Sequence, residues 1–99
     1  MTITQKRNES QLSLLLEGRL DTTTAPELEK VIKSSLDGVT ELTIDMSRLD
    51  YLSSAGLRIL LGAQKTMNKQ GGMKVTHVNE TIMEILEVTG FVDILTIEK

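Results

Sequence analysis

Apolar residues recur along this chain with two different periods, and the two periods alternate. From residue 11 onward, short runs in which every second residue is apolar alternate with longer segments in which apolar residues recur every three or four positions. The first pattern is typical of strands and the second of amphipathic helices. Alternation of strands and helices predicts crossover connections and a largely parallel or mixed sheet. We therefore expect one α/β domain that spans residues 1–99.

The expected order of elements is β-β-α-β-α-β-α-β. Residues 1–7 and 11–20 form two alternating runs joined by turn residues, which predicts a hairpin, and Gly18 indicates a bulge or a close backbone approach. Further strands are expected over residues 42–46, 73–78 and 91–97, with a polar connection over residues 47–50 after the first of them.

Each of the three expected helices has residues that start and stop it. Thr24 and Glu27 have the spacing of a capping box, and Pro26 falls in the first turn, where its missing N–H is tolerated. The expected start and stop residues of the three helices are Thr24 and Asp37-Gly38, Ser53 and Gly71-Gly72, and Asn79 and Gly90.

Composition narrows the possible functions. The formal net charge is −3, Lys and Arg are scattered, and Tyr51 and Phe91 are the only aromatic residues. Nucleic-acid binding needs a basic face, and single strands also need stacking rings, so no nucleic-acid partner is expected. The chain has no cysteine, no apolar run long enough to span a membrane, and no signal peptide pattern. We expect a cytoplasmic monomer with no membrane span, no metal and no cofactor.

Catalysis has little support in the sequence. His77 is the only histidine, and it lies in a predicted strand in phase with Met73 and Val75, where a structural role is expected. With one histidine and no cysteine, most transition-metal and Cys/His nucleophilic sites are unavailable. Neither the nucleophile elbow Gly-x-Ser-x-Gly nor the Walker spacing is present. We expect no catalytic residues and no enzyme activity.

The most informative segment is Ser53-Ser54-Ala55-Gly56, which opens the second helix. One serine would suffice to cap the helix. Two serines followed by two small residues also leave a low, accessible surface that the backbone of another protein could approach. A helix N-terminus has free N–H groups and partial positive charge, so it tolerates a phosphate. Residue chemistry alone leaves both readings open, a structural cap and a phosphorylated switch.

At these residues the sequence resembles the STAS domain family. The resemblance rests on Tyr51-Leu52-Ser53-Ser54-Ala55-Gly56-Leu57, with Leu42-Thr43-Ile44-Asp45 before it and Gly71-Gly72-Met73-Lys74-Val75 after it. Glu17-Gly18-Arg19-Leu20-Asp21 and Val88-Thr89-Gly90-Phe91 match two further segments of the family, so the resemblance covers nearly the whole chain. It implies a four- to five-stranded mixed sheet with helices packed mainly on one face.

The resemblance also implies a function and a site. Single-domain members are bacterial anti-sigma factor antagonists: the unphosphorylated form binds an anti-sigma factor with serine kinase activity and so releases a sigma factor. Phosphorylation ends the interaction and a serine phosphatase restores it. The family motif is usually Asp-Ser-Ser/Thr-Gly, with the first serine modified. Carried over, the aspartate falls on Ser53, the phosphoserine on Ser54 and the next hydroxyl on Ala55, with Ser53 as a second candidate.

Neighbouring positions are candidates for partner binding. The resemblance places Asp21, in the loop after the second strand, and Asp45, at the end of the third, near the Ser54 end of the sheet. The remaining candidate contacts are at the start of the second helix: Ser53, Gly56, Leu57 and Arg58. Two alternatives stay open, a STAS subunit of a lipid-transport ABC system or stressosome-like scaffold, and an acyl-carrier-type protein with a prosthetic group on a helix-entry serine.

Overall fold

The computed structural model describes residues 1–98 and contains a five-stranded sheet in the order β1-β2-β3-β4-β5. β1 and β2 are antiparallel and joined as a hairpin, while the pairs β2–β3, β3–β4 and β4–β5 are parallel. The elements along the chain are β1 (Thr2–Asn8), β2 (Gln11–Leu20), α1 (Ala25–Ser35), β3 (Glu41–Leu52), α2 (Ser54–Gln70), β4 (Gly72–Thr76), α3 (Glu80–Val88), the 3-10 helix η1 (Phe91–Asp93) and β5 (Ile97–Glu98).

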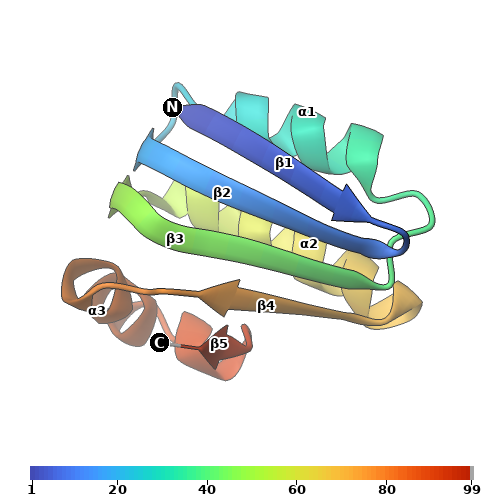
Figure 1. The fold of residues 1–99 in the computed structure, drawn as a ribbon. Coiled ribbons are helices and arrows are strands. Elements are labelled where there is room, and N and C mark those ends of the chain that lie inside the picture. Colours follow the sequence, from blue (N-terminus) through green and yellow to red (C-terminus); the bar gives the residue numbers. More distant parts are fainter. Residues whose placement is uncertain (99) are drawn as a thin grey trace.

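The helices are distributed unequally around the sheet. α1 and α2 lie behind the strands in Figure 1 and cover one face, whereas α3 lies beyond the end of β4, beside β3. Asn79 ties α3 in place, because its side-chain amide donates to the Leu49 carbonyl (3.0 Å) and its side-chain oxygen caps the Ile82 N–H (2.9 Å). The predicted mixed sheet, with helices mainly on one face, is confirmed. It also excludes the helical bundle of an acyl-carrier-type protein.

The core is aliphatic, because the chain has only two aromatic residues, Tyr51 and Phe91. Alternate residues of the central strands point toward α1 and α2 because side chains on a strand alternate between faces. The buried apolar residues contributed by β2, β3 and β4 are Leu12, Leu14, Leu16, Leu20, Leu42, Ile44, Met46, Leu49, Leu52, Met73 and Val75.

The predicted order of elements is confirmed, but the bounds of two strands were wrong. β3 does not stop at Met46: it continues through residues 47–50, predicted as a polar connection, and pairs with the second half of β2 as far as Leu20↔Leu52. Register shifts on either side of Gly18, whose φ is +102°, accommodate the extension, and they confirm the bulge expected there. Of the strand predicted over residues 91–97, Phe91–Asp93 form η1 and only Ile97 belongs to a strand, the two-residue β5.

The helix starts were predicted better than the helix-capping contacts. Ser53 and Asn79 cap α2 and α3 with their side chains, and Pro26 lies in the first turn of α1. The capping box at Thr24 is wrong, because the Thr24 side chain makes no cap hydrogen bond to α1. Its hydroxyl donates instead to the Arg19 carbonyl (2.7 Å) and accepts from the Asp21 N–H (2.9 Å).

Candidate functional site at the start of helix α2

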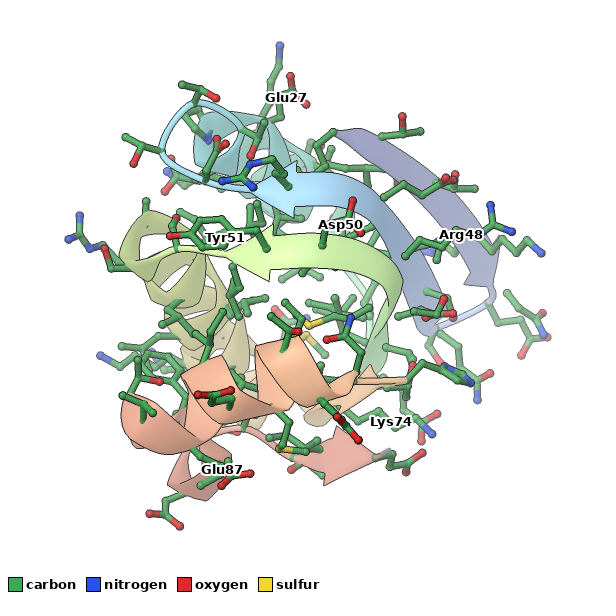
Figure 2. The ribbon with its side chains drawn as sticks, turned by 90° about the vertical axis from the view of Figure 1, so that its left-hand side faces the viewer. Glu27, Arg48, Asp50, Tyr51, Lys74 and Glu87 are labelled. Carbon is green, nitrogen blue, oxygen red and sulfur yellow. The ribbon has the colours of Figure 1, made fainter. Side chains whose placement is uncertain are left out.

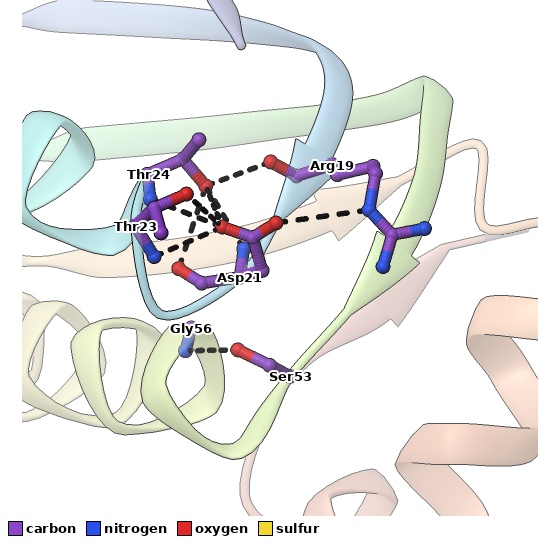
Figure 3. A network of polar contacts seen from close by, with 6 residues as sticks. All are labelled: Arg19, Asp21, Thr23, Thr24, Ser53 and Gly56. Carbon is purple, nitrogen blue, oxygen red and sulfur yellow. Dashed lines mark hydrogen bonds and ion pairs between the residues drawn. The ribbon is translucent and has the colours of Figure 1, made fainter.

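The extension of β3 brings two loops to the same end of the sheet. Leu20 and Leu52 are partners in the parallel pair, so the residues that follow them leave the sheet side by side. The Ser53 N–H continues the sheet pattern by donating to the Leu20 carbonyl at 2.9 Å. The Asp21 loop therefore lies directly beside the start of α2, as Figure 3 shows.

The two serines at this position have different environments. Ser53 is half-buried and caps α2: its hydroxyl oxygen accepts from the Gly56 N–H at 3.3 Å, and its carbonyl accepts from the Leu57 N–H at 2.9 Å. Ser54 is the first residue of α2 and is exposed. Within residues 1–98, its hydroxyl makes no side-chain hydrogen bond, so Ser54 carries the accessible hydroxyl of the pair.

Two of the predicted partner contacts lie inside the molecule. Gly56 is buried, and a Cβ there would lie 2.5 Å from Leu20 Cγ and 3.0 Å from Leu52 Cδ1. Leu57 is only 4% exposed and belongs to the core. Gly56 seats the helix against Leu20 and Leu52 at the ends of β2 and β3, and neither Gly56 nor Leu57 has an accessible side chain to offer a partner. Arg58, in contrast, is exposed.

Asp21 organises its loop through one carboxylate oxygen. Oδ1 accepts from the Thr23 hydroxyl (2.7 Å), the Thr23 N–H (3.0 Å) and the Thr24 N–H (3.1 Å). These bonds favour the ionised carboxyl, the Thr23 hydroxyl most of all, and lower the pKa of Asp21 below its usual value of 3.8. A fixed negative charge thus lies next to the start of α2.

An arginine–tyrosine pair that the sequence did not predict lies beside this loop. The Arg19 guanidinium is 4.4 Å from the centroid of the Tyr51 ring, and its Nε is 3.6 Å from Asp21 Oδ2. Both side chains are exposed, and Figure 2 shows Tyr51 on the strand that leads to α2. The pairing depends on the register Arg19↔Tyr51, which the bulge near Gly18 sets and which residue spacing cannot reveal.

Asp45 does not join this group. It lies in the middle of β3, eight residues before Ser53, which at about 3.3 Å per strand residue places it roughly 20 Å or more away. Its Oδ1 accepts from the Ser47 N–H (2.8 Å) and lies 3.5 Å from His77 Nδ1. His77 also departs from its prediction: it follows β4, has a positive φ of 56°, and its side chain is 65% exposed.

Neither metal-binding nor membrane-spanning features were found in the part of the chain that the structure describes. Over residues 1–98, no three His, Asp or Glu side chains gather as metal ligands would. In the same range, every helix is too short or too polar to cross a bilayer. The site consists of the Asp21 loop, the Arg19–Tyr51 pair and the serine-capped start of α2.

Comparison with known proteins shows the family of this chain. The sequence model of the STAS domain family matches residues 2–99. The anti-sigma-B factor antagonist of Bacillus subtilis is 29% identical over 93 residues, which cover 93% of this chain and 85% of that protein. An anti-sigma factor antagonist from Mycobacterium paratuberculosis has a solved structure that superposes with a TM-score of 0.88 at 26% identity, over 98% of this chain and 84% of that one.

A further solved structure shares the fold at lower identity. The phosphorylated form of the Bacillus cell fate determinant SpoIIAA superposes with a TM-score of 0.75 at 16% identity, over 99% of this chain and 92% of that one. The sheet order, the helices and the match over residues 2–99 agree, and the chain belongs to the STAS domain family.

Proposed function

We propose that this chain is an anti-sigma factor antagonist that is switched off by phosphorylation of Ser54. The unphosphorylated protein binds an anti-sigma factor with serine kinase activity in the cytoplasm, and a serine phosphatase restores the binding form. The observation that carries the proposal is the difference between the environments of the two serines. Ser53 is occupied as the helix cap, while Ser54 offers an exposed hydroxyl one residue later.

The surroundings of Ser54 suit a switch that alters docking without unfolding the domain. A phosphate adds about −1.5 to −2 charges, and the free N–H groups and partial positive charge of a helix N-terminus stabilise it there. The Asp21 carboxylate already contributes negative charge at the same end of the sheet. A partner packed over Ser54 would have to bury the added charge, and its binding would weaken.

The departures from the usual family motif fit this proposal. Ser53 stands where the family usually has aspartate, and serine and aspartate are both favoured N-cap residues. The helix start is thus kept while the acidic neighbour is lost. Similarity to anti-sigma factor antagonists supports antagonism of an anti-sigma factor, and the phosphorylated form of SpoIIAA supports the idea that this fold can carry a phosphate.

The proposal is tested by mapping phosphate. The protein is incubated with ATP and each serine-kinase anti-sigma factor of its source organism, and the modified residue is identified by mass spectrometry. We expect phosphate on Ser54, and no phosphate on the Ser54→Ala variant. Phosphate on Ser53 alone would move the site by one residue. No modification by any kinase would favour the transport-subunit or scaffold alternative.

Two matched variants separate the switch from the cap. Ser54→Asp should weaken partner binding and leave Tm nearly unchanged, because Ser54 is exposed. Ser53→Ala removes the cap and should lower the free energy of unfolding by about 1 kcal/mol, or about 4–8 °C in Tm, while Ser54 is still phosphorylated. If Ser54→Asp unfolds the domain instead, Ser54 has a structural role.

A further inference from the structure

A groove between α1 and α2 has an apolar floor and a charged rim. Its volume is about 220 Å³. Its principal lining residues are Ile32, Ile59, Gly62, Ala63, Lys33 and Arg58. Small-molecule sites usually occupy about 300–1,000 Å³, so this groove is small for a ligand and closer to the size of one or two side chains.

Gly62 in this groove has no evident role in the fold. It lies in the middle of α2, and a Cβ added there would meet no atom within 4 Å. Glycine is among the least favourable residues in a helix interior. Two other glycines differ from Gly62. An added Cβ would collide with Leu20 at Gly56, in the first turn of α2, and with the Thr40 backbone at Gly71, which ends the helix. Gly62 keeps the groove open, and open space above a helix suits the close approach of another molecule.

The groove is continuous with the proposed switch. Ser54, Arg58 and Gly62 are spaced by four residues, so they follow one another along the same side of α2. At 1.5 Å rise per residue, Gly62 lies about 12 Å along the helix from Ser54. A protein partner that covers a typical 800 Å² on each side would span both positions.

The charges on the rim indicate what the partner carries there. Lys33 and Arg58 bring two positive charges to opposite rims, and Glu29, 3.9 Å from Lys33, offsets one of them. The exposed Arg58 also lies one turn from the positive end of α2. This arrangement complements an apolar side chain flanked by a carboxylate.

We infer that the α1–α2 groove is the second half of the docking surface for the anti-sigma factor, an inference that rests on the proposed function. The partner inserts an apolar side chain over Gly62 and places an acidic side chain beside Arg58. Ser54 then lies at one end of the docking surface, and the groove that binds the partner's apolar side chain lies at the other end.

The test is a titration of the wild-type protein and its variants with the anti-sigma factor that phosphorylates Ser54. Gly62→Gln fills the groove and should weaken binding at least tenfold, while better helix propensity raises Tm by about 3–6 °C. Lys65→Gln, which introduces the same side chain at an exposed position of α2 outside the groove lining, should bind like the wild type. Arg58→Glu should weaken binding at least tenfold, with Arg58→Gln intermediate.

The outcomes separate this inference from the proposed function. Wild-type affinity in Gly62→Gln, in a protein that still binds and is phosphorylated at Ser54, overturns the groove and leaves the switch intact. Equal loss in Gly62→Gln and Lys65→Gln also overturns it, because the effect would not be specific to the groove. Absence of binding by the wild type to every anti-sigma factor overturns both.

Discussion

Gly56 lies in the first turn of α2, and adding one methyl group there tests how closely the helix start is held against the sheet. In Gly56→Ala the new Cβ would lie 2.5 Å from Leu20 Cγ, 2.9 Å from Leu20 Cδ2 and 3.0 Å from Leu52 Cδ1. Leu20 and Leu52 are themselves 0% and 2% exposed, so they have little room to move aside. The helix start or the two strand ends must shift.

The expected magnitude follows from two opposing terms. Overpacking a core typically costs about 1–3 kcal/mol. Replacing a helical glycine with alanine gains up to about 1 kcal/mol. The net loss in Gly56→Ala should therefore be about 0–2 kcal/mol. Gly62→Ala, in the same helix but with open space around the new Cβ, should keep only the gain of about 1 kcal/mol.

Urea unfolding of the two variants isolates the steric term, since the propensity gain is common to both. The free energies of unfolding should differ by about 1–3 kcal/mol, with unchanged m-values. Thermal melts should show the same order, at about 4–8 °C per kcal/mol. If both variants are stabilised equally, the helix start is not held against Leu20, and the seating role given to Gly56 is refuted.

Two further predictions concern the neighbours of the serines. Leu57→Ala should lower the free energy of unfolding by about 2–5 kcal/mol, and Arg58→Ala by no more than about 0.5 kcal/mol; similar losses in urea unfolding would contradict the opposite orientations of these residues. Asp21 has a lowered pKa, so its stabilising effect should be complete above its usual value of 3.8 and disappear as pH falls through the lower folded value. Thermal melts at several pH values should show that the difference in Tm between the wild type and Asp21→Asn disappears only in acid; a difference that disappears near neutral pH would contradict the lowered pKa of Asp21. An NMR titration should show that Thr23→Val raises the Asp21 pKa.

Local signals in the sequence predicted the helix starts and the class of fold. Ser53, Asn79 and Pro26 act within one turn of the chain, so their effects depend on few distant contacts. Thr24 shows the limit of that reasoning. Its spacing to Glu27 is that of a capping box, but its hydroxyl is drawn to the Arg19 carbonyl by the tight turn at Asp21.

Strand lengths were less predictable because pairing decides them. Ser47, Arg48 and Asp50 are polar and break the alternation, yet β3 continues because β2 is long enough to pair with it. Leu49 and Leu52 are buried in this extension. At the β5 edge of the sheet, Phe91–Asp93 turn as η1, and only Ile97 and Glu98 pair with β4, opposite Val75 and Thr76. Local patterns do not show how far a neighbouring strand extends.

The candidate site was predicted in part for the same reason. The serine pair was visible as a motif, and Asp21 follows a strand that ends at the same place as β3. Asp45 was misplaced because β3 runs on past it. Arg19 and Tyr51 face each other only in the register that follows the bulge near Gly18, and a bulge of one residue reverses the face on which side chains lie.

The hydrogen bond from the Ser53 N–H to the Leu20 carbonyl has a consequence for how an enzyme would meet Ser54. With that bond intact, Ser54 is presented on a helix anchored to the sheet, not on an extended segment that could be threaded through a cleft. The Asp21 loop beside it is more than thirty residues away in sequence. A short peptide around Ser54 would lack that loop and the helix, so a modifying enzyme would read the folded surface and distinguish a folded from an unfolded copy of the protein.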